Sequence, residues 1–301
     1  MQSATSALAP SPRIVVISPC RDEQATLART IESMRAQTLK PALWVVVDDG
    51  SRDRTPEILA AAAREIPWLR VVRRGDRGFR RLGGGVIDAF YEGLAAVDGH
   101  YDFVAKMDVD LEFGPRYFER LVAEFAKDPK LAAASGKVYR PENGRLVLEF
   151  MIDEMVAGQF KFYRRDAFEQ IGGFVRELMW DGIDFHRARM LGFRTASLED
   201  PELRILHLRL MGSSDRSIYR GRMRWGAGQW FMGSAFPYIA ASGVFRMRER
   251  PYIVGGLLIM LGYLKAAFSG EPRYDDLEFR KSLRSWQYGR LAGLLRGRGV
   301  R

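Results

Sequence analysis

Cysteine is nearly absent from this sequence: Cys20 is the only one among 301 residues, so no internal disulfide bond can form. This shortage is typical of proteins from a reducing compartment. The first 12 residues lack the basic start and apolar core of a signal peptide, and they predict a disordered tail. Hydrophobic residues make up 47% of the chain and charged residues 28%, which excludes a wholly disordered protein.

Acidic residues are scarce only in the last third of the chain. Residues 201–301 hold 18 Lys and Arg against 7 Asp and Glu, whereas residues 1–200 hold 29 against 30. The net charge of +10 therefore arises at the C-terminal end. Such a local excess predicts an anionic partner, which is either a membrane surface or a polyanion.

Short apolar strands alternate with helical patterns from residue 13 onward. Predicted strands span residues 14–18, 43–47, 69–73 and 103–107, and predicted helices follow at about 27–38, 55–66, 86–97 and 115–125. Thr55 and Pro56 are expected to be the N-cap and the first residue of their helix. Four such units in succession predict an α/β fold with a mostly parallel sheet and helices on both faces.

Acidic side chains follow three of the four predicted strands. They are Asp22 and Glu23, Asp48 and Asp49, and Asp108 and Asp110. Because the carboxyl ends of parallel strands meet at one edge of a sheet, these groups are expected to lie together. Asp108 and Asp110 form a D-x-D whose carboxylates would share one side of an extended segment and suit Mg²⁺ or Mn²⁺, although such pairs also occur on solvated loops. Asp22 and Glu23 have an alternative role as helix caps.

Three motifs stand at intervals that resemble a known family. The motifs PCRDE, VVDDGSRDRT and KMDVDLEF together resemble the inverting family 2 glycosyltransferases of GT-A fold, over roughly residues 13–211. The resemblance implies a catalytic domain at 13–212 that takes a sugar from a UDP or GDP donor with the help of a divalent cation, Mn²⁺ or Mg²⁺. A C-terminal helical region at 213–301 would follow it.

The resemblance also implies roles for individual residues. Those that would line the nucleotide pocket are Pro19, Arg21, Asp22 and Glu23. Asp49 would bind the edge of the base, and Asp108 would face the ribose or the metal. Asp110 would ligate the metal that bridges the diphosphate, where a cation stabilises the charge of the leaving group.

A glycine- and arginine-rich loop is expected near the diphosphate. It includes Arg80, Arg81 and Gly83–Gly85. Gly84 would allow a close approach of the backbone, and Arg81 would pair with phosphate. A solvated loop is the alternative for the whole segment.

Three residues nearer the C-terminus are further candidates for the donor site. His207 would join the metal or diphosphate site, with a purely structural histidine as its alternative. Arg209 and Arg224 would contact phosphate. Gly221 replaces the Gln of the Q-x-x-R-W motif of processive polysaccharide synthases, so processive synthesis is not predicted.

The general base is ambiguous, because the segment WDGIDFHRARMLG departs from the family pattern E-D-x-D-L. Gly182 occupies the usual position of the base, Asp184 falls on the last Asp, and Asp181 lies one residue earlier. We predict Asp181 as the base, since it lies beside a tryptophan at a helix start near the expected acceptor. Asp184 is the second choice, and its structural alternative is a salt bridge with Arg187 or Arg189.

Two charge-free runs, 225–245 and 251–264, lie in the basic C-terminal region. The first is long enough to span a bilayer, but several glycines and Pro237 interrupt it, and the second is short. Apolar and aromatic residues set among arginines predict insertion into the interface of one leaflet, which makes this an amphipathic, membrane-associating region. The alternative is a helical subdomain packed on the catalytic domain.

These observations predict a metal-dependent inverting glycosyltransferase, peripheral or monotopic on the cytoplasmic face of the inner or plasma membrane. It would transfer a sugar to a lipid-linked or glycan acceptor in polysaccharide or glycolipid assembly, and nucleic acid is not an expected partner. A nucleotidyltransferase is one alternative, but no Gly-rich loop follows the first strand. A noncatalytic basic protein is another, but it leaves the paired carboxylates unexplained. The missing G-x-G-x-x-G argues against a dinucleotide dehydrogenase.

Overall fold

The computed structural model describes residues 11–76, 84–142, 144–149, 151–209 and 217–296. The strands of a first sheet are β1 (Ile14–Cys20), β2 (Leu43–Asp48), β3 (Leu69–Arg73), β4 (Phe103–Met107), β6 (Leu131–Gly136), β9 (Phe160–Arg164) and β10 (Arg194–Leu198). A second sheet consists of β5 (Leu111–Phe113), β7 (Val138–Glu142), β8 (Arg145–Leu148) and β11 (Ile205–His207). The helices are α1 (Leu27–Arg35), α2 (Thr55–Glu65), α3 (Gly84–Ala95), α4 (Tyr117–Lys127), α5 (Arg165–Gln170), α6 (Trp180–Met190), η1 (Pro201–Leu203), α7 (Ile218–Met232), α8 (Phe236–Arg246), α9 (Val254–Phe268) and α10 (Leu277–Leu295).

The first sheet has the strand order β10-β6-β9-β4-β1-β2-β3. β1 pairs in parallel with β2 and β4, β2 pairs in parallel with β3, and β10 pairs in parallel with β6. Only β9 runs antiparallel to its neighbours, β4 and β6. The prediction of an α/β fold with a mostly parallel sheet is therefore confirmed. β1 continues to Cys20, two residues beyond its predicted end.

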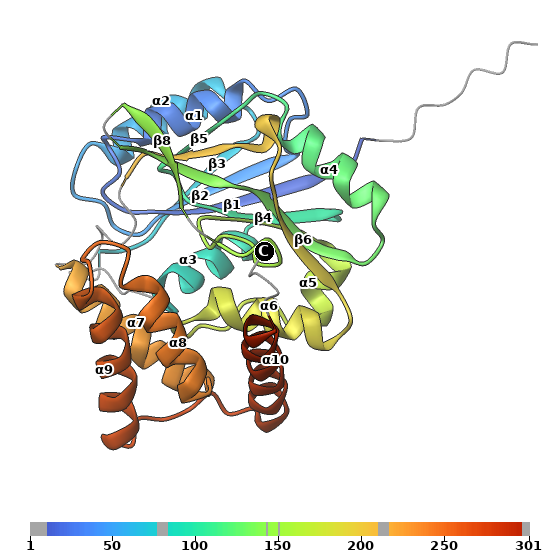
Figure 1. The fold of residues 1–301 in the computed structure, drawn as a ribbon. Helices are drawn as coiled ribbons and strands as arrows, with labels where there is room; N and C mark the ends of the chain where they lie inside the picture. The colour runs from blue at the N-terminus through green and yellow to red at the C-terminus, as the bar shows by residue number, and fades with distance from the viewer. Residues whose placement is uncertain (1–10, 77–83, 143, 150, 210–216, 297–301) are drawn as a thin grey trace, which may run out of the picture.

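Alternate residues of β1 enter two separate cores. Ile14 and Val16 pack with side chains of α1, α2 and α4, whereas Val15 and Ile17 pack with side chains of α3 and α5. Figure 1 shows α1 and α2 above the sheet and α3, α5 and α6 below it. A strand buried on both faces needs apolar side chains at every position, which is why its sequence reads as a continuous hydrophobic run.

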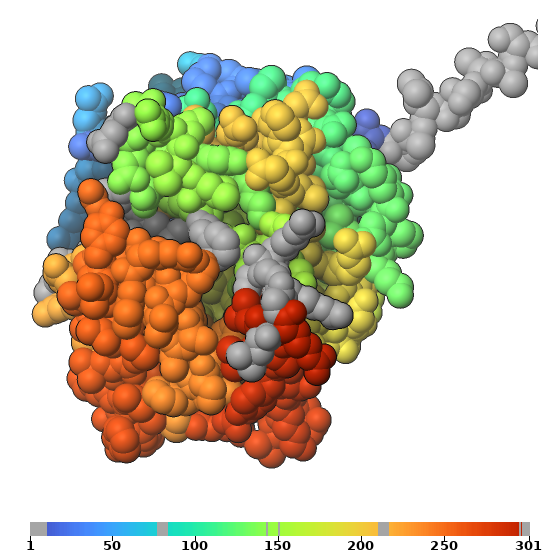
Figure 2. Space-filling model, in the orientation of Figure 1, coloured from blue at the N-terminus to red at the C-terminus, as the bar shows by residue number. Residues whose placement is uncertain are grey.

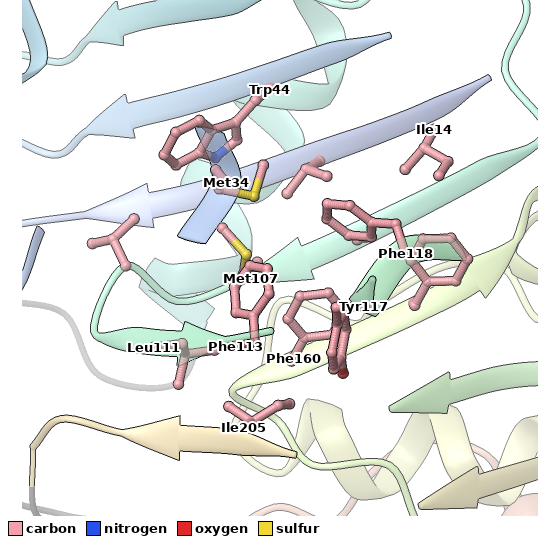
Figure 3. Close-up of a cluster of buried hydrophobic side chains, with 14 of the residues drawn as sticks. Ile14, Met34, Trp44, Met107, Leu111, Phe113, Tyr117, Phe118, Phe160 and Ile205 are labelled. Carbon is pink, nitrogen blue, oxygen red and sulfur yellow. The ribbon is translucent and has the colours of Figure 1, made fainter. Parts of the chain in front are cut away.

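The larger core holds the segment that carries the D-x-D. Figure 3 shows Met107 and Leu111 in one cluster with aromatic rings that include Tyr117 and Phe160. The ring centres of Tyr117 and Phe160 are 4.9 Å apart. Met107 and Leu111 are fully buried and flank the two carboxylates in the sequence. The loop between them is thus anchored at both ends in a close-packed interior.

The second sheet brings the end of β11 to the D-x-D. β5 begins one residue after Asp110, and it pairs antiparallel with β11 so that His207 lies opposite Leu111. The backbone N–H of Leu208 then donates to the carbonyl oxygen of Asp110, at 2.8 Å. Residues almost one hundred positions apart in the chain are placed side by side by this short strand pair.

Several helix ends differ from their predictions. α1 ends at Arg35, not near residue 38, and α3 spans Gly84–Ala95, not 86–97. Thr55 is the first residue of α2 and not its N-cap, because its hydroxyl accepts the N–H of Glu23 at 2.8 Å. Asp53 accepts the N–H of Thr55 instead. The threonine therefore ties the loop after β1 to the start of α2.

The C-terminal region is a group of helices below the sheet (Figure 1). The first charge-free run is divided between α7 and α8 at Gly233, whose φ of +87° ends α7. α10 packs on α6 through Phe279 and Leu283, which contact Ile183 and Met232. No helix among the described residues is both long and apolar enough to cross a bilayer.

The crossing of α7 and α9 depends on glycine. A Cβ atom added to Gly262 would lie 2.1 Å from the carbonyl oxygen of Met223 in α7. We therefore expect Gly262→Ala to destabilise the protein by about 1–3 kcal/mol, because the two backbones must move apart. Thermal or urea unfolding measures this loss. Gly289→Ala, in α10, is the control, since nothing lies within 4 Å of an added Cβ there. Equal stability of the two variants would contradict the close packing.

Candidate functional site

The loops after β1 and β2 are joined by hydrogen bonds at the edge of the first sheet. Asp22 donates its N–H to the hydroxyl of Ser51 at 2.9 Å and accepts the N–H of Arg52 at 2.8 Å. Arg21 donates to the carbonyl oxygen of Asp49 at 2.8 Å and to the carboxylate of Asp76 at 2.9 Å. These bonds give Asp22 a structural role between the two loops and hold it at a φ of +55°.

Asp49 is buried at this edge beside an arginine. Its carboxylate accepts a hydrogen bond from Arg74 at 2.9 Å, and its N–H donates to the carbonyl oxygen of Cys20. Pro19 lies in β1 opposite Val47 of β2, so it borders the same edge. The adjacent carboxylate of Asp48 accepts the N–H of Ser51 at 2.9 Å. Arg21, Asp22 and Asp49 therefore lie on two neighbouring loops, and Pro19 lies beside them near the end of β1.

The two carboxylates of the D-x-D have different hydrogen-bond partners. β4 ends at Met107, before both aspartates, so the alternation of an extended strand does not align them as predicted. Asp108 accepts a hydrogen bond from Lys106 at 2.6 Å. Partial burial raises the pKa of Asp108, and Lys106 opposes this shift. Asp110 instead meets Arg209, whose Nε lies 3.1 Å from Oδ2.

Asp110 and His207 lie at the centre of the site. The imidazole Nε2 is 3.5 Å from Asp110 Oδ2, and Nδ1 is 3.0 Å from Glu149 Oε1. Burial alone would raise the pKa of Asp110, but the His207 hydrogen bond and Arg209 hold it at about 2. Burial alone would lower the pKa of His207, but the two carboxylates raise it to about 10. Without a cation, an imidazolium between two carboxylates is the resulting charge arrangement, and a cation bound to Asp110 and His207 would take the place of the proton on Nε2.

This pair fits a divalent cation. Asp110 Oδ1 is buried and finds no hydrogen-bond partner among the described residues, so one oxygen remains for a ligand. Carboxylate oxygen and imidazole nitrogen both suit Mn²⁺. Glu149 orients the imidazole through the other ring nitrogen, as carboxylates do for metal-binding histidines. Within the described part of the chain no third Asp, Glu, His or Cys completes a group of metal ligands, and Asp108 is bound to Lys106.

Arg209 connects the D-x-D to the loop after β1. Its guanidinium bonds both Asp110 and Glu23, and the carboxylate of Glu23 is only 5% exposed. Burial opposes the charged form of Arg209, but the two carboxylates raise its pKa. A fixed guanidinium in this position can bind a phosphate group.

The start of α6 lies close to the D-x-D. Lys106 donates to the carbonyl oxygen of Gly158 at 2.8 Å as well as to Asp108. A Cβ atom added to Gly158 would lie 3.0 Å from Oδ2 of Asp181, in the first turn of α6. The Lys106 ammonium lies 5.3 Å from the centre of the Trp180 ring. The structure thus brings Asp181 to the same region as Asp108.

Asp184 is placed differently, inside the protein. Its carboxylate accepts hydrogen bonds from Lys161 at 2.7 and 2.6 Å and from the Tyr163 hydroxyl at 2.6 Å. The side chains of Asp184 and Lys161 are 0% and 1% exposed. Burial raises the pKa of Asp184, and Lys161 opposes the shift. The salt bridge considered for Asp184 exists, but its partner is Lys161 and neither Arg187 nor Arg189.

We expect Lys161→Met to destabilise the protein by about 3–5 kcal/mol, because it leaves a buried carboxylate without its cation. Urea unfolding measures the loss. The double variant Lys161→Met, Asp184→Leu removes both charges and should recover most of the stability, since a buried ion pair contributes little compared with apolar packing. If Lys161→Met alone were as stable as the wild type, water would have to reach the carboxylate of Asp184.

Two of the remaining candidates lie on helices, and the third is outside the described residues. Gly84 is the buried first residue of α3, and Arg224 is half-buried in α7. Arg81 lies outside the described residues. Sequence reasoning missed Lys106 and Glu149, which bind Asp108 and His207. Lys106 did carry a signal, because it is a charged residue inside a strand whose other residues are apolar.

A mixed α/β sheet with acidic residues at the carboxyl ends of its parallel strands is the arrangement expected of a protein of GT-A type. The sequence profile described as "Glycosyl transferase family 2" matches residues 15–166, about half of the chain. The chain therefore belongs to glycosyl transferase family 2, a family of sugar-transferring enzymes.

Two curated relatives agree with this membership. The chain is 26% identical over 196 residues to beta-monoglucosyldiacylglycerol synthase of Synechocystis sp., covering 58% of this chain and 40% of the relative. It is 28% identical over 217 residues to glycosyltransferase AglD of Haloferax volcanii, covering 64% of this chain and 33% of the relative. The chain thus spans less than half the length of either protein.

Solved structures share the fold. The mannosyltransferase PcManGT of Pyrobaculum calidifontis, in complex with GDP-Man and Mn²⁺, has a TM-score of 0.53 at 16% identity, with 94% of this chain and 87% of that one covered. TarS of S. aureus in complex with UDP-GlcNAc has a TM-score of 0.52 at 16% identity, with 90% and 78% covered. At such identities the likeness shows a GT-A-like fold.

Proposed function

We propose that this protein transfers a sugar from a nucleoside diphosphate sugar to a lipid acceptor, with inversion at the anomeric carbon. The observation that carries the proposal is the Asp110–His207 pair, in which a buried oxygen lacks a hydrogen-bond partner among the described residues and a fixed arginine lies alongside. A carboxylate pair alone would repel a diphosphate. Arg209 and a site for a cation make the same place attractive to it.

Different residues at the sheet edge are proposed to bind different parts of the donor. Pro19, Arg21 and Asp49 border the space for the nucleoside, and Arg209 and Arg224 are proposed to meet the phosphates. Asp110 and His207 would hold a divalent cation, which supplies positive charge to the departing nucleoside diphosphate. Arg209 adds a second fixed positive charge beside the same oxygens. Glu149 keeps the imidazole in place.

Asp181 is proposed to remove the proton of the acceptor hydroxyl. It lies at the start of α6, within contact of Gly158, whereas the alternative, Asp184, has no exposed surface. A base must come within hydrogen-bond reach of the hydroxyl that it activates. The acceptor oxygen would then attack the anomeric carbon as the bond to the diphosphate breaks, which inverts the configuration.

The acceptor and location are proposed on chemical grounds. One relative carries diacylglycerol in its name, and the basic C-terminal region exposes apolar side chains. We therefore place the protein peripherally on the cytoplasmic face of a membrane, in glycolipid or polysaccharide assembly. The single, buried cysteine is consistent with that reducing side.

Calorimetric titration of the protein with UDP and with GDP, each with and without Mn²⁺, tests the donor site. We expect one of the two to bind in the micromolar range and to need the metal. That result also identifies the nucleotide base of the sugar donor. Absence of binding to both nucleotides under both conditions would overturn the proposed function.

A further inference from the structure

One face of α9 is lined by exposed apolar side chains. Val254, Leu257, Leu261 and Phe268 are between 45% and 88% exposed. Lys265 is the only charged residue of the helix. At about 100° per residue these five positions fall within roughly 80° of arc on one side of the helix. We call them the α9 stripe.

The opposite face of α9 consists largely of small residues that contact other helices. A Cβ atom on Gly262 would lie 2.1 Å from a carbonyl oxygen of α7, and one on Gly256 would lie 2.2 Å from the carbonyl oxygen of Gly243 in α8. In a helix of a water-soluble domain the large apolar residues face the core. In α9, Ile259 and Tyr263 do face the other helices, but they are interspersed with glycines, and further large apolar residues face outward, as in helices that pack within a bilayer.

The stripe is bordered by positive charge at the connection between α8 and α9. Arg248 and Arg250 are exposed there, next to exposed Tyr252 and Ile253. The one acidic residue of this connection, Glu249, is bound by Arg222 at 3.1 Å and by Arg246. The connection therefore presents two exposed guanidinium groups beside an apolar surface: Arg248 lies over the ring of Phe245, and Arg250 is 3.9 Å from the carboxylate of Glu142.

We propose that the α9 stripe is the surface by which this protein docks on an anionic lipid bilayer. The helix lies flat in the interface, with Leu257, Leu261 and Phe268 among the acyl chains. Lys265, Arg248 and Arg250 bind lipid phosphates at the level of the headgroups. Fifteen residues reach only about 22 Å, which is shorter than the roughly 30 Å of a bilayer core, so the helix lies along the surface.

The arrangement of helices agrees with this orientation. In Figure 1 the C-terminal helices lie below the sheet, with α9 at the outer edge of the group, and Figure 2 shows their orange and red atoms in the lower part of the same view. The proposal rests on the membrane association included in the proposed function, and it specifies the surface and the lipid charge. A second copy of the chain is the alternative partner that could bury the α9 stripe, but two identical basic surfaces would repel each other.

Flotation with vesicles tests the docking surface. Phosphatidylcholine vesicles are compared with vesicles that also contain phosphatidylglycerol, using the full chain and the variant Leu257→Gln, Leu261→Gln. We expect the wild type to prefer the anionic vesicles and the variant to lose at least about tenfold in partitioning. Leu146→Gln, Leu148→Gln is the control, because these two β8 leucines are exposed to a similar degree. Its partitioning should match the wild type.

Two further measurements distinguish docking on anionic lipid from dimer formation and from loss of the donor site. Arg248→Gln, Arg250→Gln should lower binding to the anionic vesicles only, and added salt should have the same effect. Unchanged vesicle binding by the leucine variant would overturn the proposal, as would a wild-type dimer that this variant converts to a monomer. Nucleotide titration of the same samples reports on the donor site. If the protein binds vesicles through the α9 stripe but binds no nucleotide, the proposed function is refuted and the docking proposal stands.

Discussion

Replacing Asp110 by Asn is expected to lower turnover on the order of 10³-fold while the fold remains intact. The substitution keeps the shape of the side chain but removes the charge beside His207 and Arg209. Metal-dependent nucleotide binding should fall to the level seen without Mn²⁺, because an amide oxygen is a weaker ligand than a carboxylate. Sugar-transfer assays and calorimetry measure the two effects.

The neighbouring Glu112→Gln provides the control for this prediction. Glu112 lies two residues further along, in β5, where its carboxylate bonds Arg29 on the surface. Loss of this exposed pair should change stability by less than about 1 kcal/mol and leave turnover unchanged. Circular dichroism and thermal unfolding establish that both variants are folded. Near-normal, Mn²⁺-dependent turnover in Asp110→Asn would mean that the metal is held elsewhere.

The architecture of the sheet could be predicted because its central strands are buried on both faces. Runs such as IVVIS and LWVVV are short, apolar and rich in β-branched residues, which favours strands buried on both faces. The direction of β9 could not be read in the same way, because its sequence FKFYR carries no information about which neighbour it joins. The N-cap of α2 was misassigned because the Thr55 hydroxyl accepts a hydrogen bond from the loop after β1, and Asp53 accepts the N–H of Thr55.

The site was predicted less completely than the fold. The joint placement of Asp110 and His207 was expected from the family resemblance, and the strand pair β5–β11 achieves it. The separate hydrogen-bond partner of Asp108 is Lys106, two residues earlier in the chain. Glu149 could not be predicted, since it follows a short hairpin whose pairing depends on the rest of the second sheet.

Asp184 shows how burial changes the interpretation of a motif. In β9, Phe160 and Phe162 enter the larger core, so the residues that alternate with them, Lys161 and Tyr163, face the other side. A buried lysine requires a carboxylate nearby, and Asp184 supplies it. The last Asp of the motif is therefore engaged in holding α6 on the sheet. This leaves Asp181 as the carboxylate of α6 that a substrate could reach.

Asp181→Asn is accordingly expected to lower kcat by about 10²–10⁴-fold and to leave the affinity for the nucleotide unchanged. The amide cannot accept the proton of the acceptor, whereas the proposed sites for the nucleoside and the diphosphate lie on other loops. Steady-state transfer assays give kcat, and calorimetry gives the affinity.

Asp166→Asn is the matched control, because Asp166 is likewise an acidic residue in the first turn of a helix, α5. Both substitutions remove a charge that favours a helix N-terminus, an effect of about 0.3–1 kcal/mol on stability. Only the Asp181 variant should lose turnover. If both variants keep full turnover, the acceptor proton is taken by another group. Asp181 then only stabilises the N-terminus of α6, as Asp166 does for α5. If Asp181→Asn instead weakens nucleotide binding as strongly as it lowers kcat, the carboxylate acts on the donor and not on the acceptor.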